Sequence, residues 1–93
     1  MNFEWDEAKS DNCFKERGFD FAYAAQAFFD PERHIRTDLR HSYGEVRVQL
    51  FGRIGPRIFV LVYTSRPDTT RIISARKANT REVKHYENST LED

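Results

Sequence analysis

The chain has 93 residues, which is enough for one domain with a modest core and leaves no room for a second. Hydrophobic residues make up 39% and aromatic residues 14% of it, which excludes a disordered chain and predicts a packed interior. The single cysteine excludes an internal disulfide, and neither a secretory leader nor an apolar run of about 18 residues is visible. We therefore expect a soluble, cytoplasmic protein.

The formal net charge of zero hides an uneven distribution of charge along the chain. Residues 1–32 carry eight acidic against three basic side chains, residues 33–84 carry twelve basic against four acidic ones, and residues 85–93 add three acidic ones. Ten of the twelve central bases are arginine, whose planar guanidinium can bind a phosphate through two hydrogen bonds. The pattern predicts a cationic central surface, although arginines that merely solvate strand faces would produce the same pattern.

The N-terminal part predicts a short strand followed by a helix. Residues 3–5 alternate as a strand does, and Asp6 is suited to cap a helix over residues 7–17. Gly18 can adopt the left-handed conformation that commonly ends a helix.

A second helix is expected after Asp20, because apolar residues recur at intervals of three and four between Phe21 and Phe28. It should end at Asp30, since the residue before a proline is disfavoured in helical conformation. A polar connection follows, and it contains His34, Asp38, Arg40 and His41.

Beyond this connection the apolar period changes from 3.6 to 2, which predicts strands over residues 46–51, 58–63 and 70–76. The second of these is apolar throughout, as expected of a central strand. Asn79, followed three residues later by Glu82, is typical of a capping box and predicts a short final helix.

The expected order is β-α-α-β-β-β-α in a single α+β domain over residues 3–88, with a frayed tail over residues 89–93. We expect a small antiparallel sheet with helices on one face. Its other face or its concave edge would display the strand arginines together.

Known catalytic signatures are absent: there is no phosphate-binding glycine loop, no Gly-x-Ser-x-Gly elbow, and no cysteine or histidine pair at metal-ligand spacing. We expect neither a metal nor a cofactor. Cys13 is expected to be a buried small hydrophobe, while His34, His41 and His85 are expected to be exposed to solvent.

The remaining arginine, lysine, glutamate and tyrosine residues suit the cleavage of RNA. In this reaction the 2′-hydroxyl attacks the adjacent phosphorus, and catalysis needs a base, an acid and cations that stabilise charge on the phosphoryl oxygens. Arginines can supply the last role without a metal, and the need for a 2′-hydroxyl confines the reaction to RNA.

Three stretches resemble the BrnT toxins, in matches that run in order from Phe3 to about Tyr86. They are Phe3-Glu4-Trp5-Asp6-Glu7-x-Lys9; Gly18-Phe19-x-x-x-x-Ala24 continuing to Phe29-x-Pro31; and Tyr43-Gly44-Glu45-x-Arg47 with Val62-Tyr63-Thr64-x-Arg66 and Arg71-Ile72-Ile73-Ser74-Ala75-Arg76-x-Ala78, followed by Glu82 and Tyr86.

The resemblance implies a fold like that of the RelE toxins, translation arrest through RNA cleavage, and neutralisation by a BrnA-type antitoxin that also binds operator DNA. The chain departs from these toxins in its first helix, where Lys-x-x-x-Asn-x-x-x-His-Gly is common. Cys13 stands here in the asparagine position and Arg17 in the histidine position, which puts a histidine-based mechanism in doubt.

Following the resemblance position by position, we assign Arg76 and Arg47 as phosphate clamps, Lys9 as a site cation or proton donor, and Glu82 as a candidate base. The remaining expected RNA-binding cations are Arg40, Arg66, Arg71, Lys77 and Arg81.

Each assignment has a purely structural alternative. Arg76 could form a salt bridge to Glu82 or Glu45, Glu82 could only cap its helix, Lys9 could pair along its own helix, and Tyr86 could be core. The competing function is a non-catalytic module that uses the basic sheet face to bind RNA or a partner protein.

Overall fold

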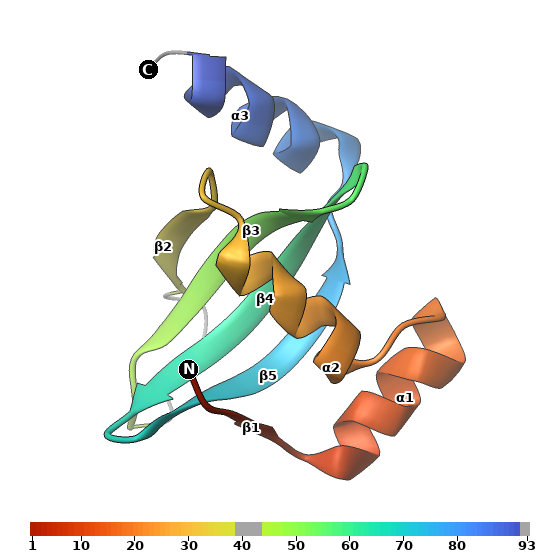
Figure 1. Cartoon of the computed structure of the whole chain (residues 1–93), viewed down its shortest axis with the longest axis vertical. Coiled ribbons are helices and arrows are strands. Elements are labelled where there is room, and N and C mark those ends of the chain that lie inside the picture. Colours follow the sequence, from red (N-terminus) through yellow and green to blue (C-terminus); the bar gives the residue numbers. More distant parts are fainter. Residues whose placement is uncertain (39–43, 92–93) are drawn as a thin grey trace.

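The computed structural model describes residues 1–38 and 44–91, and within them an α+β fold is built on a five-stranded sheet (Figure 1). The sheet order is β1-β5-β4-β3-β2. The strands are β1 (Phe3–Trp5), β2 (His34–Asp38), β3 (Arg47–Ile54), β4 (Arg57–Arg66) and β5 (Thr69–Lys77). The helices are α1 (Glu7–Arg17), α2 (Phe21–Ala24), the 3₁₀ helix η1 (Ala25–Phe29) and α3 (Thr80–Leu91).

The first helix is confirmed with its predicted ends. Asp6 accepts a hydrogen bond from the backbone N–H of Lys9, and Gly18 takes a φ of 85° as its own N–H closes the last turn on Phe14. Asp20 caps α2 in the same way, through the N–H of Tyr23.

The second predicted helix is formed by two consecutive helices, the α-helix α2 and the 3₁₀ helix η1, which together carry the predicted apolar stripe. The 3₁₀ segment brings Ala27 directly against Gly52 of β3, where an added Cβ would lie 2.4 Å from the Ala27 carbonyl oxygen. Glycine at this position therefore permits the helix backbone to lie on the sheet.

The sheet is mixed, so the prediction of an antiparallel sheet is wrong at one edge. β1 pairs in parallel with β5, with Glu4 opposite Arg71, while the other strand pairs are antiparallel. Periodicity identifies a three-residue strand but carries no signal for its pairing partner. The partner is the edge of β5, which lies more than sixty residues further along the chain.

The predicted polar connection contains a further strand, β2, so the expected order lacked one strand. Ile35, Arg36 and Thr37 are all exposed, because β2 is an edge strand with little cover on either face. Without a buried face, its sequence shows no apolar alternation. Arg40 and His41 lie outside the described residues.

The helices do not all lie on one face, which corrects the expected layering. α1, α2 and η1 pack on the face that carries Leu50, Phe59 and Leu61, which we call the covered face. α3 packs Val83 and Tyr86 on Phe51, Ile58 and Val60, which point to the opposite side. Because β4 is apolar on both faces, it needs cover on both sides.

The face opposite the covered face is the basic face, and α3 covers only the end at which β5 terminates (Figure 1). Strand register and alternation place six arginines on it: Arg36, Arg47, Arg53, Arg66, Arg71 and Arg76. The segregated charge of the sequence thus becomes a segregated surface.

None of the described helices is long and apolar enough to cross a membrane.

Candidate active site

A groove of about 400 Å³ runs between α1 and the edge of β5. β1 covers this edge only as far as Ile72, and α1 lies along the following residues, with the Cys13 thiol 3.6 Å from the Ala75 carbonyl oxygen. The groove is lined by Lys9, Asn12, Cys13, Glu16, Arg17, Phe21, Ile73, Ser74, Ala75 and Arg76.

Three cations line the groove. Lys9 and Arg17 lie eight residues apart on α1, a spacing that places both on the helix face that carries Cys13, and Arg76 comes from β5. Arg17 also lies 3.6 Å from Glu16 in an exposed ion pair, which is worth little in water. The structure therefore brings the predicted catalytic residues Lys9 and Arg76 to one groove, with Glu82, also predicted, bound to Arg76. It adds Arg17, which stands where the related toxins commonly have histidine.

Cys13 is buried, as predicted, and burial raises the pKa of its thiol. It forms part of the groove floor as a small apolar group, and its neutral thiol is a poor nucleophile.

Arg76 and Glu82 form a two-point ion pair. The two guanidinium nitrogens donate to the two carboxylate oxygens at 2.7 and 2.8 Å. The Arg76 side chain remains 38% exposed, so the ion pair fixes the guanidinium without removing it from solvent.

Glu82 also completes the predicted capping box: its carboxylate accepts from the Asn79 N–H, and its own N–H donates to the Asn79 side chain. The hydrogen bond from Arg76 is the main cause that lowers the Glu82 pKa to about 2. A carboxylate with so low a pKa is a weak base at neutral pH. The geometry thus favours the capping and ion-pair alternatives over the predicted role of base.

Arg47 lies on the basic face but far from Arg76. Extending the β3–β4 register by one residue places Arg47 beside Thr64, whereas Arg76 pairs with Val60 on the other side of β4. Strand geometry gives a separation of roughly 15 Å between the two arginine backbones. The structure therefore does not bring the two predicted phosphate clamps together.

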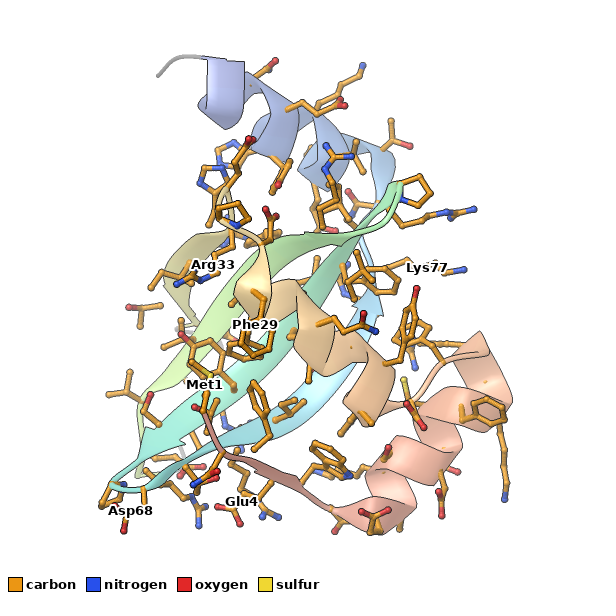
Figure 2. The ribbon with its side chains drawn as sticks, in the orientation of Figure 1. Met1, Glu4, Phe29, Arg33, Asp68 and Lys77 are labelled. Carbon is orange, nitrogen blue, oxygen red and sulfur yellow. The ribbon has the colours of Figure 1, made fainter. Side chains whose placement is uncertain are left out.

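Arg66 and Arg71 surround Glu4 at the end of the sheet away from α3. Arg71 donates to Glu4 at 3.3 Å, and Arg66 lies 3.9 Å from Glu4 and 3.7 Å from Glu45. Figure 2 shows Glu4 at the end of the sheet that holds the β4–β5 turn, opposite Lys77. These partly exposed pairs can exchange for phosphate at small cost.

The other predicted RNA-binding cations lie apart from this cluster. Arg81 is exposed on α3 and lines a cleft with Arg36, Phe51, Asn79, Glu82 and His85. Lys77 pairs with Phe59 and therefore belongs to the covered face, not the basic one.

Tyr86 is core, 1% exposed, and its hydroxyl donates to Asp30. Burial would raise the Asp30 pKa, but the hydrogen bonds from Tyr86 and from the N–H groups of Glu32 and Arg53 together outweigh it, and the pKa is lowered. Burial, followed by the bond to Asp30, raises the Tyr86 pKa to about 12. This contact joins α3 to the loop after η1.

His34 is not fully exposed as expected, because its ring packs edge-on against Tyr86 with 5.3 Å between ring centroids. His85 is exposed, as predicted, and His41 lies outside the described residues.

Sequence reasoning missed the contributions of Arg36 and Arg53 to the basic face. The Arg36 guanidinium lies 5.0 Å from the centre of the Phe51 ring and donates to Gln49, and Arg53 lies 5.5 Å from the Tyr86 ring centre. The predicted strand ended at residue 51, and only continuing its alternation to residue 53 would have placed Arg53 on the same face as Arg47. Arg36 carried no signal, because β2 was not recognised.

Among the residues that the structure describes, no three His, Cys, Asp or Glu side chains gather as a group that could hold a metal ion.

Comparison with known proteins identifies one family. The family model described as a ribonuclease toxin, BrnT, of type II toxin–antitoxin systems matches residues 5–82, which is most of the chain. No curated protein matches the chain. Such a family implies an antitoxin as partner. The match spans α1, the whole described sheet apart from the first two residues of β1, and the start of α3. The chain therefore belongs to the BrnT family of ribonuclease toxins.

Proposed function

We propose that this chain is a metal-independent endoribonuclease that arrests translation in the cytoplasm. It cleaves RNA by promoting attack of the RNA 2′-hydroxyl on the adjacent phosphorus. The proposal includes a fold like that of the RelE toxins and neutralisation by a BrnA-type antitoxin, through which the complex contacts operator DNA. The family match supports the ribonuclease class, and the cationic groove supports the site.

The observation that carries the proposal is the convergence of Lys9 and Arg76, from two different elements, on one groove. In the reaction the 2′-oxygen forms a bond to phosphorus, the bond from phosphorus to the 5′-oxygen breaks, and the proton of the 2′-hydroxyl leaves to water. Arg76 stabilises the charge on the phosphoryl oxygens, and the Lys9 ammonium donates a proton to the departing 5′-oxygen.

Glu82 acts in this scheme as a positioning residue. Its carboxylate holds the Arg76 guanidinium through both nitrogens, which restricts the rotamers of a long side chain before substrate arrives. Preorganised charge is worth more to the transition state than a mobile cation, because no reorganisation is needed during the reaction.

Arg66, Arg71 and Arg47 serve as cations that hold the RNA backbone along the basic face. Thr64 pairs with Arg71, so Arg47 and Arg71 flank it on neighbouring strands, roughly 10 Å apart across the sheet. The ion pairs of Arg66 and Arg71 to carboxylates are partly exposed, and phosphate can replace these carboxylates. Arg81 extends the same function to α3, and Arg40 is proposed for it from the sequence alone.

The experiment incubates partner-free protein with end-labelled RNA, with and without translating ribosomes, and analyses the product ends. Wild-type protein should release fragments with 2′,3′-cyclic phosphate ends, and Arg76→Ala should lower the rate by about 10²- to 10³-fold. Lys9→Ala should lower the rate by about 10²-fold.

Lys15→Ala is the matched control for Lys9→Ala, because Lys15 is exposed on the same helix and is not among the residues that line the groove. It should cleave at the wild-type rate. Intact RNA with folded wild-type protein in both settings would contradict the nuclease proposal. It would favour the alternative, a non-catalytic module that binds RNA or its partner.

A further inference from the structure

A second pocket, of about 340 Å³, opens where the end of α1 meets α2 and the ends of β4 and β5. It is lined by Phe14, Arg17, Gly18, Phe19, Tyr23, Arg57, Phe59 and Lys77. Figure 2 shows Lys77 at the end of β5 on this side of the molecule. None of the catalytic roles proposed above uses this pocket.

Four of its lining residues are aromatic. Phe19 and Phe59 are buried and meet edge-to-face with ring centroids 5.0 Å apart, so they form a fixed floor. Tyr23, 44% exposed, packs on Phe59 at 5.9 Å, and Phe14 is 58% exposed. Two aromatic rings thus remain available to a ligand beside a rigid aromatic base.

Cations supply its charge. Arg17, Arg57 and Lys77 line the pocket, and none of its described lining residues is acidic. Arg17 also lines the groove between α1 and β5, so the two sites share a side chain and are adjacent.

We propose that this pocket is a base-binding subsite, which takes one unstacked base of single-stranded RNA while its cations hold the flanking phosphates. The inference rests on the proposed function insofar as the neighbouring groove holds the phosphate to be cleaved. Aromatic faces stack on any base, and arginine and lysine pair with the backbone, which is the combination that single-strand binding uses.

The size of the pocket favours a base over a helix of a partner protein. A volume of about 340 Å³ lies in the range of small-ligand sites, whereas a docked helix needs an elongated groove with anchors on successive turns. Lys77 was predicted to bind RNA but lies away from the basic face. In this pocket it is one of the cations that hold the flanking phosphates.

The test measures binding of short 2′-O-methyl oligonucleotides by fluorescence anisotropy, because this RNA analogue has no free 2′-hydroxyl and cannot be cleaved. The variant Phe14→Ala/Tyr23→Ala should bind about 5- to 100-fold more weakly than wild type, as expected for the loss of one base stack. Phe29→Ala is the matched control: Phe29 is 67% exposed on η1 and lies apart from Lys77 in Figure 2. It should bind as wild type.

An abasic scan separates stacking from a general loss of structure. Among oligonucleotides that each lack one base, only the one missing the base bound in the pocket should bind wild-type protein more weakly. The double variant should bind that oligonucleotide as well as it binds the intact one. The single variant Tyr23→Phe keeps Phe14 and the aromatic ring at position 23, and it should bind the oligonucleotide as wild type does. Circular dichroism reports whether each variant is folded.

Equal binding of the oligonucleotide by wild type and folded double variant would overturn the inference and leave the nuclease proposal untouched. A double variant that binds RNA normally but loses affinity for the antitoxin would also overturn it, by assigning the pocket to the partner protein. If the double variant and the abasic scan behave as expected but wild type leaves RNA intact, the subsite stands and the nuclease proposal fails.

Discussion

The two faces of the sheet are built by the same strands but differ in burial and in charge. Along β4, Phe59 and Leu61 point to the covered face and are at most 2% exposed, while their neighbours Val60 and Val62 point to the face that carries the arginines. The covered face is apolar beneath the helices and carries Lys77 only at its margin. The basic face is apolar only at its centre and under α3, and it is charged elsewhere.

Apolar packing and surface charge are thus carried by alternate residues of the same strands. Burial of large apolar side chains contributes to stability roughly in proportion to area, whereas the exposed arginine–carboxylate pairs contribute little. We therefore expect substitutions on the covered face to change unfolding, and those on the open part of the basic face to change RNA binding.

The largest effect should come from Leu61→Ala on the covered face. Leu61 has no exposed surface, and truncation leaves a cavity in the main core, so the free energy of unfolding should fall by about 2–5 kcal/mol. Urea denaturation followed by circular dichroism measures this. A loss below 1 kcal/mol would mean that the covered face is not the principal source of stability.

Tyr86→Phe should have the next largest effect, because it acts where the basic face is covered by α3. The change removes the buried hydroxyl that donates to Asp30 and should cost about 1–3 kcal/mol. Hydrogen exchange should show faster opening of α3 than of α1. Tyr23→Phe, at a partly exposed tyrosine, is the control and should leave unfolding nearly unchanged.

Glu82→Gln should cost about 1–2 kcal/mol at pH 7 and should change the pH dependence of stability. The folded-state pKa of Glu82 is lowered from 4.5 to about 2, so its contribution is present above the unfolded value and disappears as the pH falls through that window. Wild type should therefore lose more stability between about pH 4.5 and 2 than the variant. Glu32→Gln, at an exposed carboxylate, should follow the wild-type profile.

Arg66→Ala should have the smallest effect on unfolding, below about 1 kcal/mol, because its carboxylate partners are partly exposed. It should instead reduce the salt dependence of oligonucleotide binding by about 0.7 in the slope of log K against log salt. Arg33→Ala, in the loop before β2 and outside the basic face, serves as control. An unchanged slope for Arg66→Ala would remove this residue from the RNA path.

Local signals were predicted well because they depend on neighbours in sequence. Asp6, Gly18 and Asp20 set helix ends through hydrogen bonds or a backbone conformation that one turn of chain decides. The ion pair of Arg76 with Glu82 was foreseeable as an alternative, since six residues separate them across one short turn.

The resemblance singled out Lys9 and Arg76, and the structure places both in one groove, while their catalytic roles stay a prediction. It could not show that Arg47 lies elsewhere or that Lys77 belongs to a different pocket. Those placements depend on strand register and on which face each residue takes, and a one-residue shift reverses the face.

The amino-acid sequence was sufficient to predict the α+β class, the ends of α1, the central strands, the segregation of charge and the family resemblance. Each of these is a property of local pattern or of ordered matches. The folded structure was needed to reveal the parallel pairing of β1, the edge strand β2, the position of α3 on the basic face and the position of Arg17 between two pockets. These features arise from contacts between distant segments, whose free energy depends on surfaces that exist only after the chain has folded.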